Sequence, residues 1–150
     1  MAIDIELLKQ IREETSASIA DCRKALVEAD GDYKKAIEWL RKRGAEIALK
    51  KADRETSQGV VESYVHGNGK IGVIVALLCE TDFVARTQEF KDLAHEIAMQ
   101  ISAMNPKNVE ELLSQEYIRD PKLKIEDLVK TTIGKTGENI KVREFSRIEL

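Results

Sequence analysis

The stretch IGVIVALLCETDFV, residues 71–84, predicts the point at which a buried strand gives way to a helix. Residues 71–79 are apolar on both faces, a pattern that suits a central strand covered by helices. Regular helical spacing of apolar residues begins soon afterwards, near Thr87. Residues 81–84 therefore form a corner between the main strand and the main helix of the domain.

Two interpretations of this corner follow from its residue types. In the first, Thr81 or Asp82 accepts a hydrogen bond from a free backbone N–H group of the first helical turn, and Phe83 covers the strand end. In the second, Phe83 protrudes as an aromatic anchor beside the Asp82 carboxylate, followed by Val84, and enters another protein. The pattern alone favours the capped turn.

The segments around the corner predict an antiparallel sheet with helices packed on it. Residues 59–66 are strand-like, and residues 67–70, Gly-Asn-Gly-Lys, supply the glycines that a tight reversal needs. Residues 139–148 predict a third antiparallel strand. Helical spacing over residues 90–101 predicts a helix that covers one sheet face, and two shorter helices follow it. The expected fold class is α+β.

The N-terminal part predicts a separate module of three short helices. Apolar residues recur at helical spacing in each helix, and Asp4, Ser18 and Asp32 are the candidate N-caps. Gly44 is expected to end the third helix, and Trp39 lies off its apolar stripe, where it either closes the core or faces a partner. The expected division is residues 1–44 for the three-helix module, 45–56 for a linker that can continue as helix, and 57–150 for the α+β core.

Composition argues against several function classes. The chain of 150 residues has 24 Lys and Arg against 27 Asp and Glu, a net charge of −3, so no global basic field exists to hold nucleic acid. It contains no run of about 18 apolar residues and no sustained apolar segment at its N-terminus. We therefore expect a cytoplasmic protein that binds neither nucleic acid nor membranes.

The chemistry-bearing residues predict binding rather than catalysis. Cys22 and Cys79 lie on apolar faces without a companion at metal-ligand spacing, and two histidines alone leave a zinc site short of ligands. Residues 134–136, Gly-Lys-Thr, resemble part of a phosphate loop, but Val129 stands where the upstream glycine would be needed. The glycines there are better explained as helix-stop and turn residues. We expect no catalytic residue, metal or cofactor.

Several stretches taken together resemble the elongation factor Ts family, the nucleotide-exchange factors of elongation factor Tu. Residues 21–26 (DCRKAL) and 35–41 (KAIEWLR) resemble the family's ubiquitin-associated-type helical module. Residues 81–86 (TDFVAR) resemble its core, and residues 137–140 (GENI) resemble its closing segment. The resemblance covers nearly the whole length, and its motifs are specific only in combination.

The resemblance implies a function for the corner. In the family the Thr-Asp-Phe-Val stretch intrudes beside the nucleotide site of elongation factor Tu and dislodges its Mg²⁺, so the wedge interpretation of Phe83 overtakes the capped turn. It implies that the protein binds elongation factor Tu, GDP-bound and nucleotide-free, and promotes GDP release so that GTP can bind. The residues expected at this partner are Thr81, Asp82, Phe83 and Val84, with Arg23, Lys24, Lys51 and Arg54 as further candidate contacts.

Beside the longer members of that family, the sequence looks like a short form without the second half of the core. We therefore expect an exposed sheet edge or face, and favour a homodimer over a monomer whose two late helices cover the sheet. The residues alone also leave another class open: a peptide- or ubiquitin-like-binding adaptor that uses the three-helix module and has no exchange activity.

Overall fold

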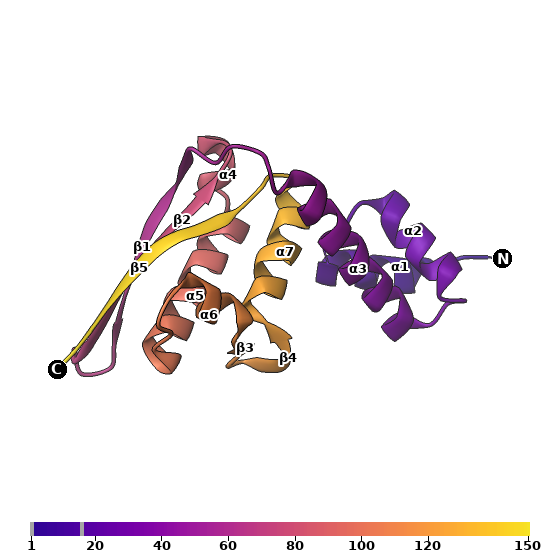
Figure 1. Cartoon of the computed structure of the whole chain (residues 1–150). Coiled ribbons are helices and arrows are strands. Elements are labelled where there is room, and N and C mark those ends of the chain that lie inside the picture. The colour runs from indigo at the N-terminus through magenta and orange to yellow at the C-terminus, as the bar shows by residue number, and fades with distance from the viewer. Residues whose placement is uncertain (1, 16) are drawn as a thin grey trace.

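The computed structural model describes residues 2–15 and 17–150. Figure 1 shows a sheet at one end of the molecule, three N-terminal helices at the other, and further helices between them. The sheet has three antiparallel strands in the order β1-β2-β5, and a small two-stranded hairpin, β3-β4, lies apart from it. The predicted α+β class with a three-stranded antiparallel sheet is confirmed.

The three N-terminal helices begin at their predicted caps. These helices are α1 (Ile5–Thr15), α2 (Ile19–Glu28) and α3 (Tyr33–Lys51). The Asp4 carboxylate accepts a hydrogen bond from the Glu6 backbone N–H at 2.9 Å. The Ser18 hydroxyl accepts one from Asp21 N–H at 3.1 Å, and Asp32 accepts one from Lys35 N–H at 3.0 Å. Each side chain satisfies a backbone donor that the first helical turn leaves free.

Helix α3 passes through Gly44 and ends only at Lys51, so the prediction that Gly44 stops it is wrong. A glycine inside a helix costs roughly 1 kcal/mol relative to alanine, and Gly44 lies where α3 contacts α7 (Ile125–Thr136). A Cβ atom added to Gly44 would lie 3.9 Å from the Lys130 carbonyl oxygen, and one added to Gly134 would lie 3.7 Å from the Gly44 Cα. Gly134 is thus an interior packing residue of α7, not the expected helix stop.

Strands β1 (Gln58–His66), β2 (Ile71–Cys79) and β5 (Lys141–Glu149) form the main sheet, with β2 in the centre. Val60 pairs with Leu77, and Val75 pairs with Phe145. The hairpin was predicted from its turn residues, the central strand from its continuous apolar run and the closing strand from its alternation, and the structure confirms all three.

The two faces of the sheet have different environments. The side chains of Val73, Val75, Leu77 and Cys79 point into the helical layer and are buried. Figure 1 shows the helices on that side of the sheet alone. We call the opposite side the outer sheet face; its exposed apolar residues are Val61, Val65, Ile74 and Ile148. The apolar run of β2 suggested helical cover on both of its faces, but the helices cover only one.

The remaining elements follow the chain from the corner to the C-terminal strand. They are α4 (Asp82–Ala85), α5 (Gln88–Met104), α6 (Val109–Ser114), β3 (Glu116–Tyr117), β4 (Asp120–Lys124) and α7. Helix α5 lies against β1 and β2, and α7 packs between α5 and α3. This order of layers leaves α4 at one end of the sheet, beside the segment that joins α3 to β1 (Figure 1).

The buried side chains form two separate clusters, and helix α3 contributes to both. Its first half, including Ala36, Ile37 and Leu40, packs with α1 and α2. Its second half brings Ile47 and Ala48 to the core under the sheet. Trp39 is half-buried and packs against the first cluster, as its predicted core-closing role requires. The change of core between Leu40 and Ile47 occurs without a break in the helix.

Candidate functional site

The corner after β2 is a single helical turn, α4, capped by Thr81. The Thr81 hydroxyl oxygen accepts a hydrogen bond from Val84 N–H at 3.2 Å. The Thr81 carbonyl accepts another from Ala85 N–H at 3.3 Å. The capping half of the first interpretation is therefore correct, with Thr81 rather than Asp82 as the cap.

Phe83 does not cover the end of the strand, because its side chain is 78% exposed. Within the same turn Val84 and Ala85 are buried and belong to the core under the sheet. The turn has only four residues, and Val84 and Ala85 already occupy its inward positions. No inward position is left for Phe83. The covering role that the capped-turn interpretation gave to Phe83 is thus wrong, and the ring projects into solvent.

Asp82 lies next to the exposed ring and pairs with Arg86 at 3.3 Å, one helical turn further on. Both side chains are largely exposed, so water screens the pair and it contributes little to stability. The surface of α4 thus presents an aromatic ring flanked by a carboxylate and a guanidinium group. Such a combination suits an aromatic anchor with polar neighbours rather than a core element.

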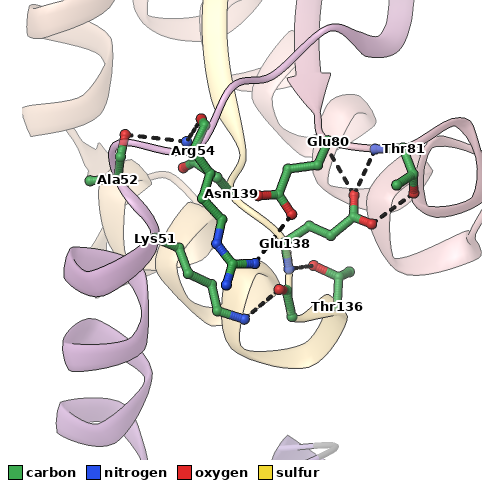
Figure 2. Close-up of polar contacts among 9 residues, drawn as sticks. Lys51, Ala52, Arg54, Glu80, Thr81, Thr136, Glu138 and Asn139 are labelled. Carbon is green, nitrogen blue, oxygen red and sulfur yellow. Dashed lines mark hydrogen bonds and ion pairs between the residues drawn. The ribbon is translucent and has the colours of Figure 1, made fainter.

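The backbone behind the ring is held by Glu138, in the turn between α7 and β5 (Figure 2). The Glu138 carboxylate accepts hydrogen bonds from Glu80 N–H at 3.1 Å, Thr81 N–H at 2.9 Å and the Thr81 hydroxyl at 2.7 Å. From the other side, the Cys79 thiol donates to the Thr81 carbonyl at 3.1 Å. All the hydrogen-bonding groups of Thr81 are therefore engaged.

The four basic residues predicted as partner contacts fall into two groups. Lys51 and Arg54 lie near the corner, where the Lys51 ammonium donates to the Gly137 carbonyl and Arg54 lies 3.7 Å from the Glu80 carboxylate. Arg23 and Lys24 are exposed on α2, at the other end of the molecule from α4 (Figure 1). The structure thus brings Lys51 and Arg54 to the corner, in contacts within the chain, and leaves Arg23 and Lys24 on a separate surface.

The thiol beside the corner is not a nucleophile at neutral pH. Burial raises the pKa of Cys79 to about 11, and the nearby Glu138 carboxylate acts in the same direction. Burial also raises the pKa of Cys22. Over residues 2–15 and 17–150, no group of three or more His, Cys, Asp or Glu side chains is placed to hold a metal ion. No helix in that part of the chain is long and apolar enough to cross a membrane.

Comparison with known proteins connects this geometry to one family. A family model described as elongation factor TS matches residues 80–150, a range that begins one residue before the Thr81 cap. Elongation factor Ts of Oleidesulfovibrio alaskensis is 42% identical over 194 aligned positions, covering 99% of this chain and 98% of the relative. The chain belongs to the elongation factor Ts family. Elongation factor Ts of Thermotoga maritima is 42% identical with 100% and 97% covered, and that of Caldanaerobacter subterraneus is 40% identical with 98% and 96% covered.

Family membership confirms the resemblance read from the sequence motifs, and the protein is accordingly a translation elongation factor of the Ts type. The alignments run over 192 to 194 positions, more than the 150 residues present here, so these elongation factor Ts relatives contain residues without a counterpart in this chain. The adaptor hypothesis rested on the helical module alone, whereas the similarity extends through the α+β core.

Sequence reasoning missed the role of Glu138 at the corner of this elongation factor Ts chain. The GENI stretch was noticed only as a family motif, and nothing in its spacing indicates which backbone groups the glutamate binds. The contact joins residues 57 positions apart, between two different turns. The one available signal for this contact was the polar Glu138 at a turn, where it has no evident capping role.

Proposed function

We propose that this protein binds elongation factor Tu and promotes release of its GDP, with Phe83 as the residue that enters the partner. Family membership supports the class of function. The observation that carries the rest is a phenyl ring that is 78% exposed on a turn whose cap residue, Thr81, has its backbone N–H, hydroxyl and carbonyl groups all hydrogen-bonded. The protein is proposed to bind both the GDP-bound and the nucleotide-free form of elongation factor Tu. Release of GDP then requires binding alone and no chemical reaction by this protein.

Exchange by binding is a matter of coupling free energy. If the factor weakens GDP binding on a shared partner, GDP weakens binding of the factor by the same ratio. Burying one Phe side chain contributes roughly 1.5–3 kcal/mol. When that burial is available only with the nucleotide site distorted, each 1.4 kcal/mol lowers nucleotide affinity about tenfold. Phe83 alone is therefore large enough to accelerate GDP release substantially.

The proposed target of the corner is the Mg²⁺ ion that accompanies GDP on the partner. Mg²⁺ requires near-ideal octahedral geometry and usually retains several waters, so a small displacement of its ligands weakens its binding. Phe83 supplies the displacement through its volume. The exposed Asp82 carboxylate acts beside it, either on the orientation of the turn or on the water shell of the ion. Thr81 and Val84 hold the turn from behind.

Release of a fluorescent GDP analogue from elongation factor Tu tests the proposal. The measurement follows fluorescence after mixing with excess unlabelled GDP, at increasing concentrations of this protein. We expect the rate of release to rise with concentration and to saturate, and added free Mg²⁺ to reduce the acceleration. An unchanged rate at saturating concentration, with a partner that binds GDP normally, contradicts the proposal.

We also propose that residues 1–44 act as a docking module, joined through residues 45–56 to the α+β core in 57–150, which carries Phe83. The separate cluster of α1, α2 and the first half of α3 supports this division. Exposed Arg23 and Lys24 on α2 are its candidate contacts. Replacing both with Glu should raise the concentration needed for half-maximal GDP release more than it lowers the maximal rate. The opposite result would mean that the module takes part in nucleotide ejection.

The outer sheet face supports a further part of the proposal, that the protein forms a homodimer. Exposed apolar patches usually mark an interface, and two-fold pairs are the commonest closed assemblies. The competing hypothesis is a monomer in which the two late helices, α6 and α7, cover the sheet. They do not cover the outer sheet face, because both lie on the opposite side (Figure 1). Light scattering over a dilution series decides the question, and a constant mass near 16.9 kDa excludes the dimer. Replacing exposed Ile74 with Lys should dissociate it.

A further inference from the structure

Three segments far apart in the sequence meet at the Thr81 cap, two residues before Phe83, and Figure 2 shows how they meet. They are the end of α3 with the following residues (51–54), the end of β2 with the α4 cap (80–81), and the turn between α7 and β5 (136–139). We call this meeting point the three-segment junction. Each hydrogen bond between these segments that is described below involves a side chain or a carbonyl group of the turn at 136–139.

The Glu138 carboxylate links that turn to the α4 cap with both of its oxygen atoms. Oε1 accepts from the backbone N–H groups of Glu80 and Thr81, and Oε2 accepts from the Thr81 hydroxyl at 2.7 Å. Because its proton points to Glu138, the hydroxyl presents a lone pair to the N–H of Val84. One carboxylate therefore determines both the backbone position and the rotamer of the cap.

The position of Phe83 depends on this arrangement more than the position of a buried residue would. Its ring is exposed and receives little support from core packing. Its backbone lies between Thr81, which Glu138 holds, and Val84, which is bonded to Thr81 and buried. A backbone held in this way before binding does not need to lose its conformational freedom on the partner.

The same turn also holds the connection to the helical module. The Asn139 side-chain amide donates to the carbonyl groups of Ala52 at 3.3 Å and Arg54 at 2.9 Å. The Lys51 ammonium donates to the Gly137 carbonyl. Since α3 runs without a break from the module to Lys51, these bonds relate the module and the Phe83 turn to one common point.

We propose that Glu138 is a positioning residue for nucleotide exchange: it holds the α4 cap so that Phe83 meets the partner in a fixed orientation, and the turn that carries it sets the orientation relative to the helical module. This inference rests on the exchange function proposed above and assigns to Glu138 no contact with the nucleotide or the metal. Substituting Glu138 should therefore lower the rate of GDP release by disturbing the orientation of Phe83, and not by removing a contact of Glu138 with the partner.

Three variants separate positioning from loss of charge or of fold. Glu138→Ala removes all three hydrogen bonds, whereas Glu138→Gln keeps a carbonyl acceptor for the backbone N–H groups and should retain part of the effect. The matched control is Glu55→Ala, which removes an exposed carboxylate next to the same junction; within residues 2–15 and 17–150 no hydrogen bond or ion pair of its side chain is found. Circular dichroism and thermal unfolding establish that each variant is folded.

Two measurements on the full-length protein test the proposal. Amide hydrogen exchange, followed by NMR, reports whether the Thr81 and Val84 N–H groups lose protection, and it does so without any partner. Fluorescent GDP release from elongation factor Tu then gives the maximal rate and the half-maximal concentration. For Glu138→Ala we expect lost protection at both amides and a maximal rate about tenfold lower, the equivalent of one charge-assisted hydrogen bond. Glu138→Gln should lose about threefold, and Glu55→Ala should match the parent.

The outcomes distinguish this inference from the exchange function itself. Unchanged protection of Thr81 and Val84 in Glu138→Ala shows that the carboxylate does not hold the turn and overturns the inference. Lost protection with a parental maximal rate also overturns it, because the orientation of the turn then does not matter. A parent that fails to accelerate GDP release refutes the exchange function and, with it, the link from positioning to exchange. If Glu138→Ala does not fold, the same criteria apply to Glu138→Gln, for which a loss equal to that of Glu55→Ala overturns the inference.

Discussion

Two consecutive helices of this protein, α4 and α5, begin at a threonine cap and have a phenylalanine in the first turn. One phenylalanine is exposed and the other is buried. Thr81 caps α4 by accepting from Val84 N–H at 3.2 Å, and Thr87 caps α5 by accepting from Phe90 N–H at 3.4 Å. The bonded N–H belongs in both cases to the third residue after the cap, and that residue is buried. Phe83 comes one residue earlier and is 78% exposed, whereas Phe90 is fully buried.

Aligning the two caps explains the difference. Phe83 occupies the position that Glu89 occupies in α5, and Glu89 is exposed. That position faces away from the core in both helices, because the inward residue of the first turn is the third one. A phenylalanine where the neighbouring helix has a glutamate contributes little to folding, so we attribute it to binding.

The largest effect we expect is from Phe90→Ala, which tests the buried member of the pair. Phe90 lies under the sheet with no exposed surface, and its truncation leaves a cavity. The free energy of unfolding should fall by about 3–5 kcal/mol, measured by urea denaturation. Phe83→Ala should change it by no more than about 0.5 kcal/mol. Similar losses for the two variants would show that the exposed ring packs on the fold after all.

Phe83→Ala should have the reverse profile in the exchange assay. Loss of the ring removes roughly 1.5–3 kcal/mol of burial on the partner, so GDP release at saturating protein should slow by about tenfold to a hundredfold. Phe83→Leu, which keeps most of the apolar volume, is the matched control and should be affected less. Circular dichroism should be unchanged for both. A variant that exchanges GDP as fast as the parent removes Phe83 from the mechanism.

The buried side of the corner should respond to alkaline pH. The pKa of Cys79 is raised from 9.0 to about 11 in the folded protein, so above pH 9 the unfolded chain releases its proton first. The free energy of unfolding should therefore fall as pH rises from about 9 to about 11, by roughly 2 kcal/mol for this group. Tyr117, with its pKa raised from 10.0 to about 12, acts in the same direction at higher pH. Urea titrations at stepped pH measure the fall, and Cys79→Ala should reduce it; an equal fall in that variant contradicts the assignment.

The smallest effect we expect is from Asp82→Ala. The carboxylate is exposed, and its pair with Arg86 is worth at most about 1 kcal/mol in water. GDP release should slow by about fivefold at most, less than for Phe83→Ala. Arg86→Ala is the comparison that separates two roles. Equal losses indicate that Asp82 orients the turn through Arg86, whereas a loss confined to Asp82→Ala indicates that the carboxylate itself acts on the partner.

Local signals were enough to predict most elements and the family. An N-cap bonds a backbone group only three residues further on, so Asp4, Ser18 and Asp32, and Thr81 as one of two candidates, could be recognised from short stretches. Strand-like residues, the turn glycines and the apolar run of residues 71–79 likewise indicated β1, β2 and their hairpin. The Thr-Asp-Phe-Val motif, together with the DCRKAL, KAIEWLR and GENI stretches, indicated the family, because a combination of short motifs can be recognised without knowledge of how they pack.

Only the tertiary structure decided three other features. Gly44 lies inside α3, at the contact with Gly134 of α7, although glycine has a low helix propensity. The outer sheet face stays exposed because the helices that contact the sheet, α4, α5 and α6, pack on its other side, a choice that an apolar strand does not encode. Glu138 holds the Thr81 cap across 57 residues. Side-chain spacing within a segment determines that segment's own hydrogen bonds and apolar face, whereas contacts between segments depend on how the whole chain packs.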